Sequence, residues 1–192
     1  MKLHRLVAVF ALTLCSLGAG RLAHAQVDPQ AMAAQKEAMK ALAMMDGVWR
    51  GPAWTILPSG EKHNITQTER IGPFLDGAVK VIEGRGYDAD GSVAFNAFGT
   101  ISYDAAKKAY TLHSYALGRV GDFNLTPNAE GYVWEIPAGP MTIRYTCTIK
   151  NGEWLEVGDR IAPGQEPVRF FEMTLKRIGD TDWPAGGHIP PR

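Results

Sequence analysis

Cysteine is scarce in this chain: only Cys15 and Cys147 occur among its 192 residues. Cys15 lies in an N-terminal segment that we expect to be removed, so Cys147 is left without a partner for an intramolecular disulfide. It stands in the alternating run MTIRYTCTIK, with no evident neighbour that would favour a thiolate. We therefore expect Cys147 to be a small buried hydrophobe, and the fold to be stabilised by burial rather than by cross-links.

Long hydrophobic runs are equally rare. Lys2 and Arg5 precede one apolar run, residues 6–17, which has the length of a signal-peptide core and is too short to cross a bilayer. The Ala-His-Ala motif at 23–25 matches the small-residue pattern of a cleavage site. We therefore predict a cleaved signal peptide over 1–25, a secreted or periplasmic mature chain, and no stable membrane insertion after cleavage.

An excess of positive charge is also missing. The chain has 20 basic and 20 acidic residues; removal of 1–25, which holds three bases and no acid, leaves 17 against 20 and a net charge of −3. This balance argues against a nucleic-acid partner and against a polybasic membrane patch. The remaining length suits one domain. No zinc-type spacing, phosphate loop or G-x-S-x-G motif occurs, so we predict no metal and no cofactor.

One N-terminal helix is predicted, within 26–47. Asp28-Pro29 is a good start, because Asp caps a first turn and Pro suits the first helical position. The run QAMAAQKEAMKALAMM follows and is rich in strong helix formers. Asp46-Gly47 then ends the helix.

From Val48 onward the apolar residues recur with the period of two that is typical of half-buried strands. Turn dipeptides such as Asp90-Gly91 and Asn151-Gly152 separate the runs and are strong hairpin signals. A meander of this length must curl or close to remove its edges. We predict an all-β fold, a single antiparallel up-and-down β-barrel of about ten strands over 48–179, followed by a Pro/Gly-rich tail, 180–192, that is flexible or draped over the surface. The expected strands are 48–57, 61–71, 78–88, 93–103, 109–117, 120–125, 131–136, 141–150, 153–161 and 167–178.

The order of these features resembles the calycin superfamily, which includes lipocalins, fatty-acid-binding proteins and nitrobindin-like haem barrels. The resemblance lies in the helix, the Gly47-Val48-Trp49 triplet, the meander, and a last strand with a late Arg. It implies a structural pair in which Trp49 packs at the closed end of the barrel against Arg177. The haem-binding relatives take an axial His from a late strand, but 153–178 contains no His, so we expect no haem.

The chain also resembles a secreted bacterial family whose function is unknown. That resemblance implies a fold and no activity. It is carried by the stretches TQTERIGPFLDG, EGRGYDADG, FNAFGTISYD, LHSYALGRVGDF and VWEIPAGPMTIRYT.

A barrel of eight to ten strands can enclose one small ligand, so the inward faces are where a site is expected. In VKVIEGRGYD, two valines share a face with Glu83, Arg85 and Tyr87, which indicates that this face points inward. Buried charges need partners, and we expect these to pair with each other or with a ligand. The predicted function is non-catalytic binding of a small, mostly apolar molecule with a polar head. The candidate ligand-binding residues are Glu83, Arg85, Tyr87, His113, Tyr145, Asp159 and Arg169.

Several alternatives stay open. A slip of one residue inverts every side chain of a strand, and alternation does not decide which face is inward in 61–71 or 109–117. An inward His113 or Glu83 would suit a small enzyme of the lyase or isomerase type, with Arg85 stabilising negative charge. A barrel filled by aromatic side chains would instead be a scaffold without a cavity. The sequence determines neither the ligand nor the oligomeric state.

Overall fold

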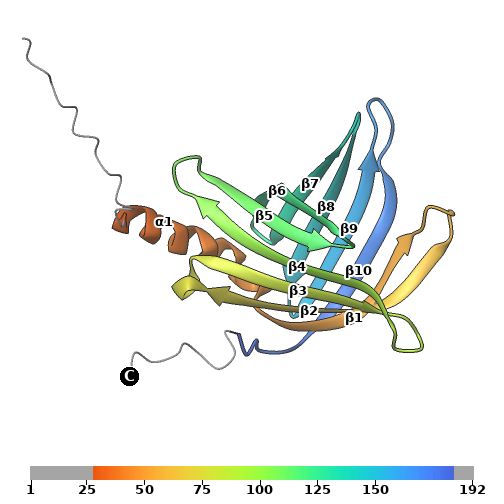
Figure 1. The fold of residues 1–192 in the computed structure, drawn as a ribbon, viewed down its shortest axis with the longest axis horizontal. Helices are drawn as coiled ribbons and strands as arrows, with labels where there is room; N and C mark the ends of the chain where they lie inside the picture. Colours follow the sequence, from red (N-terminus) through yellow and green to blue (C-terminus); the bar gives the residue numbers. More distant parts are fainter. Residues whose placement is uncertain (1–27, 184–192) are drawn as a thin grey trace, which may run out of the picture.

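A computed structural model describes residues 28–183. Ten antiparallel strands form a closed barrel in which each strand pairs with the next along the chain and β1 pairs with β10 (Figure 1). The all-β barrel predicted from the alternation is confirmed, and hairpins lie at predicted turn dipeptides such as Asp90-Gly91 and Asn151-Gly152. The strands are β1 Gly47–Ile56, β2 Lys62–Phe74, β3 Val79–Tyr87, β4 Val93–Asp104, β5 Ala109–Ala116, β6 Arg119–Asn128, β7 Gly131–Ala138, β8 Met141–Lys150, β9 Glu153–Ile161 and β10 Val168–Gly179; a 3₁₀ turn, η2 Leu75–Gly77, joins β2 to β3.

The predicted helix lies across one end of the barrel (Figure 1). It consists of α1, Pro29–Met39, and a 3₁₀ turn, η1, Lys40–Met45. The Asp28 carboxylate caps α1 by accepting hydrogen bonds from two backbone N–H groups in the first helical turn. The helical segment contributes Leu42 and Met45 to the core, where both are fully buried. This end of the barrel is therefore closed, and no helix in the described part of the chain is long and apolar enough to span a membrane.

The entry from the helix into β1 requires a glycine. Gly47 has a φ of +140°, and a Cβ atom there would lie 2.9 Å from both the Gly179 carbonyl oxygen and Arg177 Nε. Trp49 and Arg177 are opposite each other in the register of β1 and β10, whereas the calycin resemblance implied that their side chains pack together. The Trp49 ring packs edge-on against Trp154 with the centroids 5.6 Å apart, and its indole N–H donates to the Met45 carbonyl. The Arg177 guanidinium instead donates to the Asp46 carbonyl, which ties the last strand to the end of the helix.

The chain continues past β10 along the outside of β2. Trp183 packs edge-on against Phe74, with ring centroids 5.9 Å apart, and lies beneath the guanidinium of Arg70, which also pairs with Asp182. The first four residues of the predicted tail are thus draped over the surface. The rest of the tail, 184–192, and the predicted signal peptide lie outside the described residues.

Candidate functional site

A cavity of about 610 Å³ occupies the half of the barrel away from the helix. Its floor is the packed layer that includes Met45 and Trp154. Its lining extends to the exposed Leu117, Arg119 and Val120 on the β5–β6 hairpin, where it meets the surface. The barrel is therefore a container with one closed end, and the alternative of a barrel without a cavity is wrong.

Small side chains on one wall create this space. On β3 to β6 many inward positions at the level of the cavity carry small side chains, which leaves space beside larger ones such as Phe95 and Phe123. At Gly84 the missing side chain leaves room for the Glu69 carboxyl, because a Cβ atom on residue 84 would lie 2.7 Å from Glu69 Oε1. The small residues that line this wall are Gly84, Ala94, Ala97, Gly99, Ser114, Ala116 and Gly121.

Aromatic rings cover the opposite wall, on β7 to β10. Trp134 and Tyr145 stack face to face with their centroids 4.2 Å apart and an interplanar angle of 6°. Phe170 and Phe171 pack edge-on against Tyr145. Burial raises the pKa of Tyr145 to about 12, so its hydroxyl is neutral at physiological pH. This wall presents large apolar surfaces with one hydroxyl among them.

Glu156, on β9, brings a carboxylate into the floor of the cavity, where it is 6% exposed. Its Oε2 accepts hydrogen bonds from the Tyr132 hydroxyl at 3.0 Å and the Trp154 indole at 3.2 Å, and its Oε1 accepts one from the Trp134 indole at 3.0 Å. Burial raises the pKa of Glu156, and the three donors oppose that rise because they stabilise the ionised form. The three hydrogen bonds therefore favour a negative charge on Glu156.

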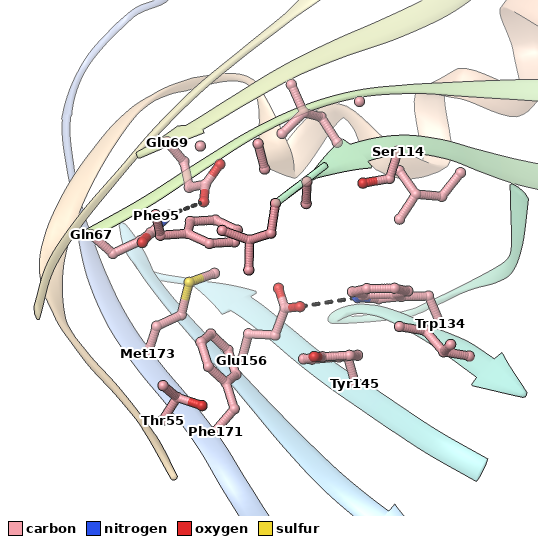
Figure 2. A pocket seen from close by; sticks show the side chains of 18 of the residues that line it. Thr55, Gln67, Glu69, Phe95, Ser114, Trp134, Tyr145, Glu156, Phe171 and Met173 are labelled. Atoms are coloured by element: carbon pink, nitrogen blue, oxygen red, sulfur yellow. Dashed lines mark hydrogen bonds between the residues drawn. The ribbon is translucent and has the colours of Figure 1, made fainter. Parts of the chain in front are cut away.

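A second carboxyl group, Glu69 on β2, faces Glu156 from the other side of the cavity (Figure 2). It is 9% exposed, and its Oε1 accepts one hydrogen bond, at 2.7 Å, from the Gln67 amide. Burial raises the pKa of Glu69 to about 8, with a further contribution from the negative charge of Glu156. At neutral pH, therefore, Glu69 is mostly protonated, and the three donors around Glu156 favour that residue as the place of any negative charge on the pair.

Tyr145 is the one predicted ligand-binding residue that the structure places in the cavity lining. The prediction that Cys147 is a small buried hydrophobe is confirmed: Cys147 lies in the core, and burial raises the pKa of its thiol. For β3 the predicted face was wrong by one residue. Ile82 and Gly84 line the cavity, while Glu83 and Arg85 form an ion pair on the outer face with Nη2 and Oε1 2.7 Å apart.

Tyr87 is opposite Thr66 of β2 and does not line the cavity either. His113 also points outward, because its neighbours Leu112 and Ser114 line the cavity while its ring pairs with Asp122. An enzyme that uses an inward His113 or Glu83 as its base is therefore excluded.

Asp159 and Arg169 pair with each other outside the cavity, with Oδ1 and Nε 2.7 Å apart. Asp159 lies on the face of β9 opposite to Trp154 and Glu156, which line the cavity. For Arg169 the reason is a β-bulge: Arg169 is opposite Asp159, but Phe171 is opposite Gly158, so Phe170 is an extra residue. Strict alternation would place Arg169 and Phe171 on one face. The bulge separates them and leaves both phenylalanines in the cavity lining.

The two cavity carboxyls were not among the predicted site residues, although the sequence holds a signal for each. In HNITQTERIG, Glu69 alternates in step with Ile65 and Ile71, which are both apolar. In EWLEVGD, Glu156 shares a face with Trp154. Reading the bulkier residue as inward would have found Glu156, but the meeting of the two groups depends on barrel closure.

Among residues 28–183 no group of three or more His, Cys, Asp and Glu side chains is arranged to hold a metal.

Comparisons with known proteins agree on the fold. No protein-family model matches the sequence, and no curated protein matches it. Among solved structures, the crystal structure of Rv2717c from M. tuberculosis is similar, with a TM-score of 0.55, 13% sequence identity, and coverage of 73% of this chain and 96% of that chain. At this identity the likeness supports a shared barrel fold and carries no information about activity.

Proposed function

We propose that this protein is a calycin-like barrel that binds a small, mostly apolar molecule with a polar group, without catalysis. The observation that supports the proposal is the cavity. Its volume of about 610 Å³ lies within the range of roughly 300–1,000 Å³ that is usual for small-molecule sites. The predicted signal peptide indicates that the binding takes place in the periplasm or outside the cell.

The lining suits such a guest. Aromatic rings line one wall and small residues the other, so a flat apolar molecule would contact rings without steric conflict. Within the described residues, the Ser114 and Tyr145 hydroxyls, both cavity-lining, take part in no side-chain hydrogen bond. These groups and the two carboxyls are few and point inward, as polar groups do in sites that orient an apolar ligand.

The proposal is tested by screening the mature protein against neutral, anionic and cationic apolar molecules, by thermal shift and native mass spectrometry. We expect at least one class to raise the unfolding temperature and to bind with a stoichiometry of one.

A matched pair of variants places binding in the cavity. Ala97 lines the cavity, and its neighbour Asn96 is exposed on the outside of the same strand. Ala97→Phe should weaken binding at least tenfold, because its ring fills the space of the guest, whereas Asn96→Phe should leave binding unchanged. A folded protein that binds none of the classes, or variants with equal effects, would contradict the proposal.

A further inference from the structure

We infer that the polar group of the ligand is a cation, so that the cavity selects hydrophobic amines over alcohols and carboxylates of the same shape. The inference deepens the proposed function and rests on it. Its basis is the pair Glu69 and Glu156, which point toward one another across an otherwise apolar cavity (Figure 2).

In the described chain neither carboxyl forms a salt bridge, and the buried Lys80 is paired at the closed end of the barrel. Two basic residues line the cavity near its rim, and Arg160 lies over the Phe170 ring with its Cζ 4.6 Å from the ring centroid. His63 is held by Asp88, with Nε2 and Oδ1 2.7 Å apart, and Arg119 is exposed. The carboxyl pair therefore has neighbouring hydrogen-bond donors but no counter-ion, which is the complement of an ammonium group.

Hydrogen-bond capacity supports the same conclusion. A carboxylate has about four acceptor positions. Glu156 uses two on Oε2 and one on Oε1, and Glu69 uses one, on Oε1, for the Gln67 amide. Unfilled acceptor positions thus remain on both residues. A primary ammonium brings three donors to these positions, whereas a carboxylate ligand would bring only acceptors and a repelling charge.

The aromatic lining adds to this selectivity. Trp134 donates its indole N–H to Glu156, so its ring stands beside the carboxylate, stacked on Tyr145. Phe95 and Phe171 lie near the carboxyl pair from other strands (Figure 2). Aromatic ring faces attract cations, and the attraction is stronger where water is excluded. The same rings bind an apolar body, so an amine and its hydrocarbon part are both accommodated.

Amine binding should release a proton. Burial raises the pKa of Glu69, and two other carboxyl groups raise it further: Glu156, across the cavity, and Glu83, on the neighbouring β3. An ammonium placed between Glu69 and Glu156 reverses this field and favours ionised Glu69. The Glu69 O–H bond then breaks, its electron pair stays on the carboxylate, and the proton passes to the buffer. Affinity should therefore rise with pH through about 8, where Glu69 titrates in the free protein.

The experiment compares three probes that share one ring system: 2-(1-naphthyl)ethylamine, 2-(1-naphthyl)ethanol and 1-naphthylacetate. Isothermal titration of the full mature chain at pH 7, in two buffers of different ionisation enthalpy, gives affinity and proton release together. We expect the amine to bind at least tenfold more tightly than the alcohol, the carboxylate to bind most weakly, and only the amine to release a proton.

Glu69→Gln tests the role of the carboxyl and keeps the shape of the side chain. It should reduce the preference for amine over alcohol at least tenfold and abolish proton release, while affinity for the alcohol is retained. Glu135→Gln is the matched control, because it removes a carboxylate from the outer face of β7 that does not act on Glu69. It should retain both the preference and the proton release.

The outcomes separate this inference from the proposed function. If the alcohol or the carboxylate binds as tightly as the amine, the inference is overturned and the barrel remains a ligand-binding protein. An unchanged amine preference in Glu69→Gln also overturns it. If none of the three probes binds, the inference is overturned, and the outcome of the wider screen decides whether the proposed function falls with it.

Discussion

The closed end of the barrel and its open half are built from the same ten strands, but their interiors differ. At the closed end, Trp49, Ile71, Trp154 and Leu175 are at most 2% exposed and fill the space under the helix. In the open half, residues as small as Gly84 occupy inward positions on the same sheet, and a cavity of about 610 Å³ remains. Side-chain volume at inward positions, rather than strand number, decides where a barrel is solid.

The two regions also treat buried charge differently. At the closed end, Lys80 is 3% exposed and pairs with Asp46 at the end of the helix. The protein itself supplies the counter-charge there. In the open half, Glu69 and Glu156 have polar neighbours but no cation from the described chain. Buried carboxyls that receive no counter-charge from the protein can accept one from a bound molecule. This contrast leads to predictions for both ends of the barrel.

The largest expected effect is at the closed end. Trp49→Ala should lower the free energy of unfolding by about 3–5 kcal/mol, because it opens a cavity in a packed layer. Phe171→Ala should cost less, about 1–2 kcal/mol, because that ring already borders empty space. Urea unfolding of both variants measures the difference, and equal losses would break the contrast between a packed and a hollow end.

The next effect concerns pH. The fold raises the pKa of Glu69 from 4.5 to about 8, so its stabilising contribution is complete below pH 4.5 and is lost as pH rises through 8. Since one pKa unit corresponds to about 1.4 kcal/mol, the loss over this shift approaches roughly 5 kcal/mol. Glu69→Gln should therefore gain stability relative to the wild type between pH 5 and pH 9. Unfolding curves at pH 5, 7 and 9 test this, and parallel pH profiles for the two proteins would show that Glu69 is ionised in the fold.

A smaller loss is expected for the ion pair at the closed end. Asp46→Ala leaves Lys80 buried without its partner, and loss of a fully buried partner costs several kcal/mol. Because the Asp46 side chain is 30% exposed, water can replace it in part, and we expect about 2 kcal/mol. Lys80→Met should restore part of that stability in the Asp46→Ala background. A double variant no more stable than the single one would argue against an uncompensated charge.

The smallest effect is expected on the outside. Arg85→Gln removes a residue that the alternation favoured as a ligand contact but that the structure places on the outer face. Its affinity for any cavity ligand should stay within twofold of the wild type, measured by isothermal titration. A tenfold loss would mean that Arg85 reaches the guest, and would reopen the question of which face of β3 is inward.

Much of the fold could be predicted because its signals are local. The helix start at Asp28-Pro29 and hairpin turns such as Asn151-Gly152 depend on backbone geometry within a few residues. The period of two depends only on neighbours along a strand. For β8, whose inner residues include Tyr145 and Cys147, the two faces differ enough for the inward one to be predicted correctly.

The site could be predicted only in part. In β3, apolar residues stand on both faces, so the two valines that share a face with Glu83 are no guide to the interior. In β10, the bulge at Phe170 shifts the pattern in the middle of the strand. Neither effect is visible in the local sequence, because each depends on what the neighbouring strand places opposite.

The sequence by itself determined the elements, their order and the closure of the meander, since these follow from periodicity, turn chemistry and the need to remove edges. Only the tertiary structure decided which faces point inward, that one wall is small and the other aromatic, and that Glu69 and Glu156 meet. These two residues are on β2 and β9, far apart in the chain, and only closure of the barrel places them on opposite sides of one cavity. Their raised pKa values follow from burial in the closed barrel, and the charge that we expect the ligand to carry follows from that meeting.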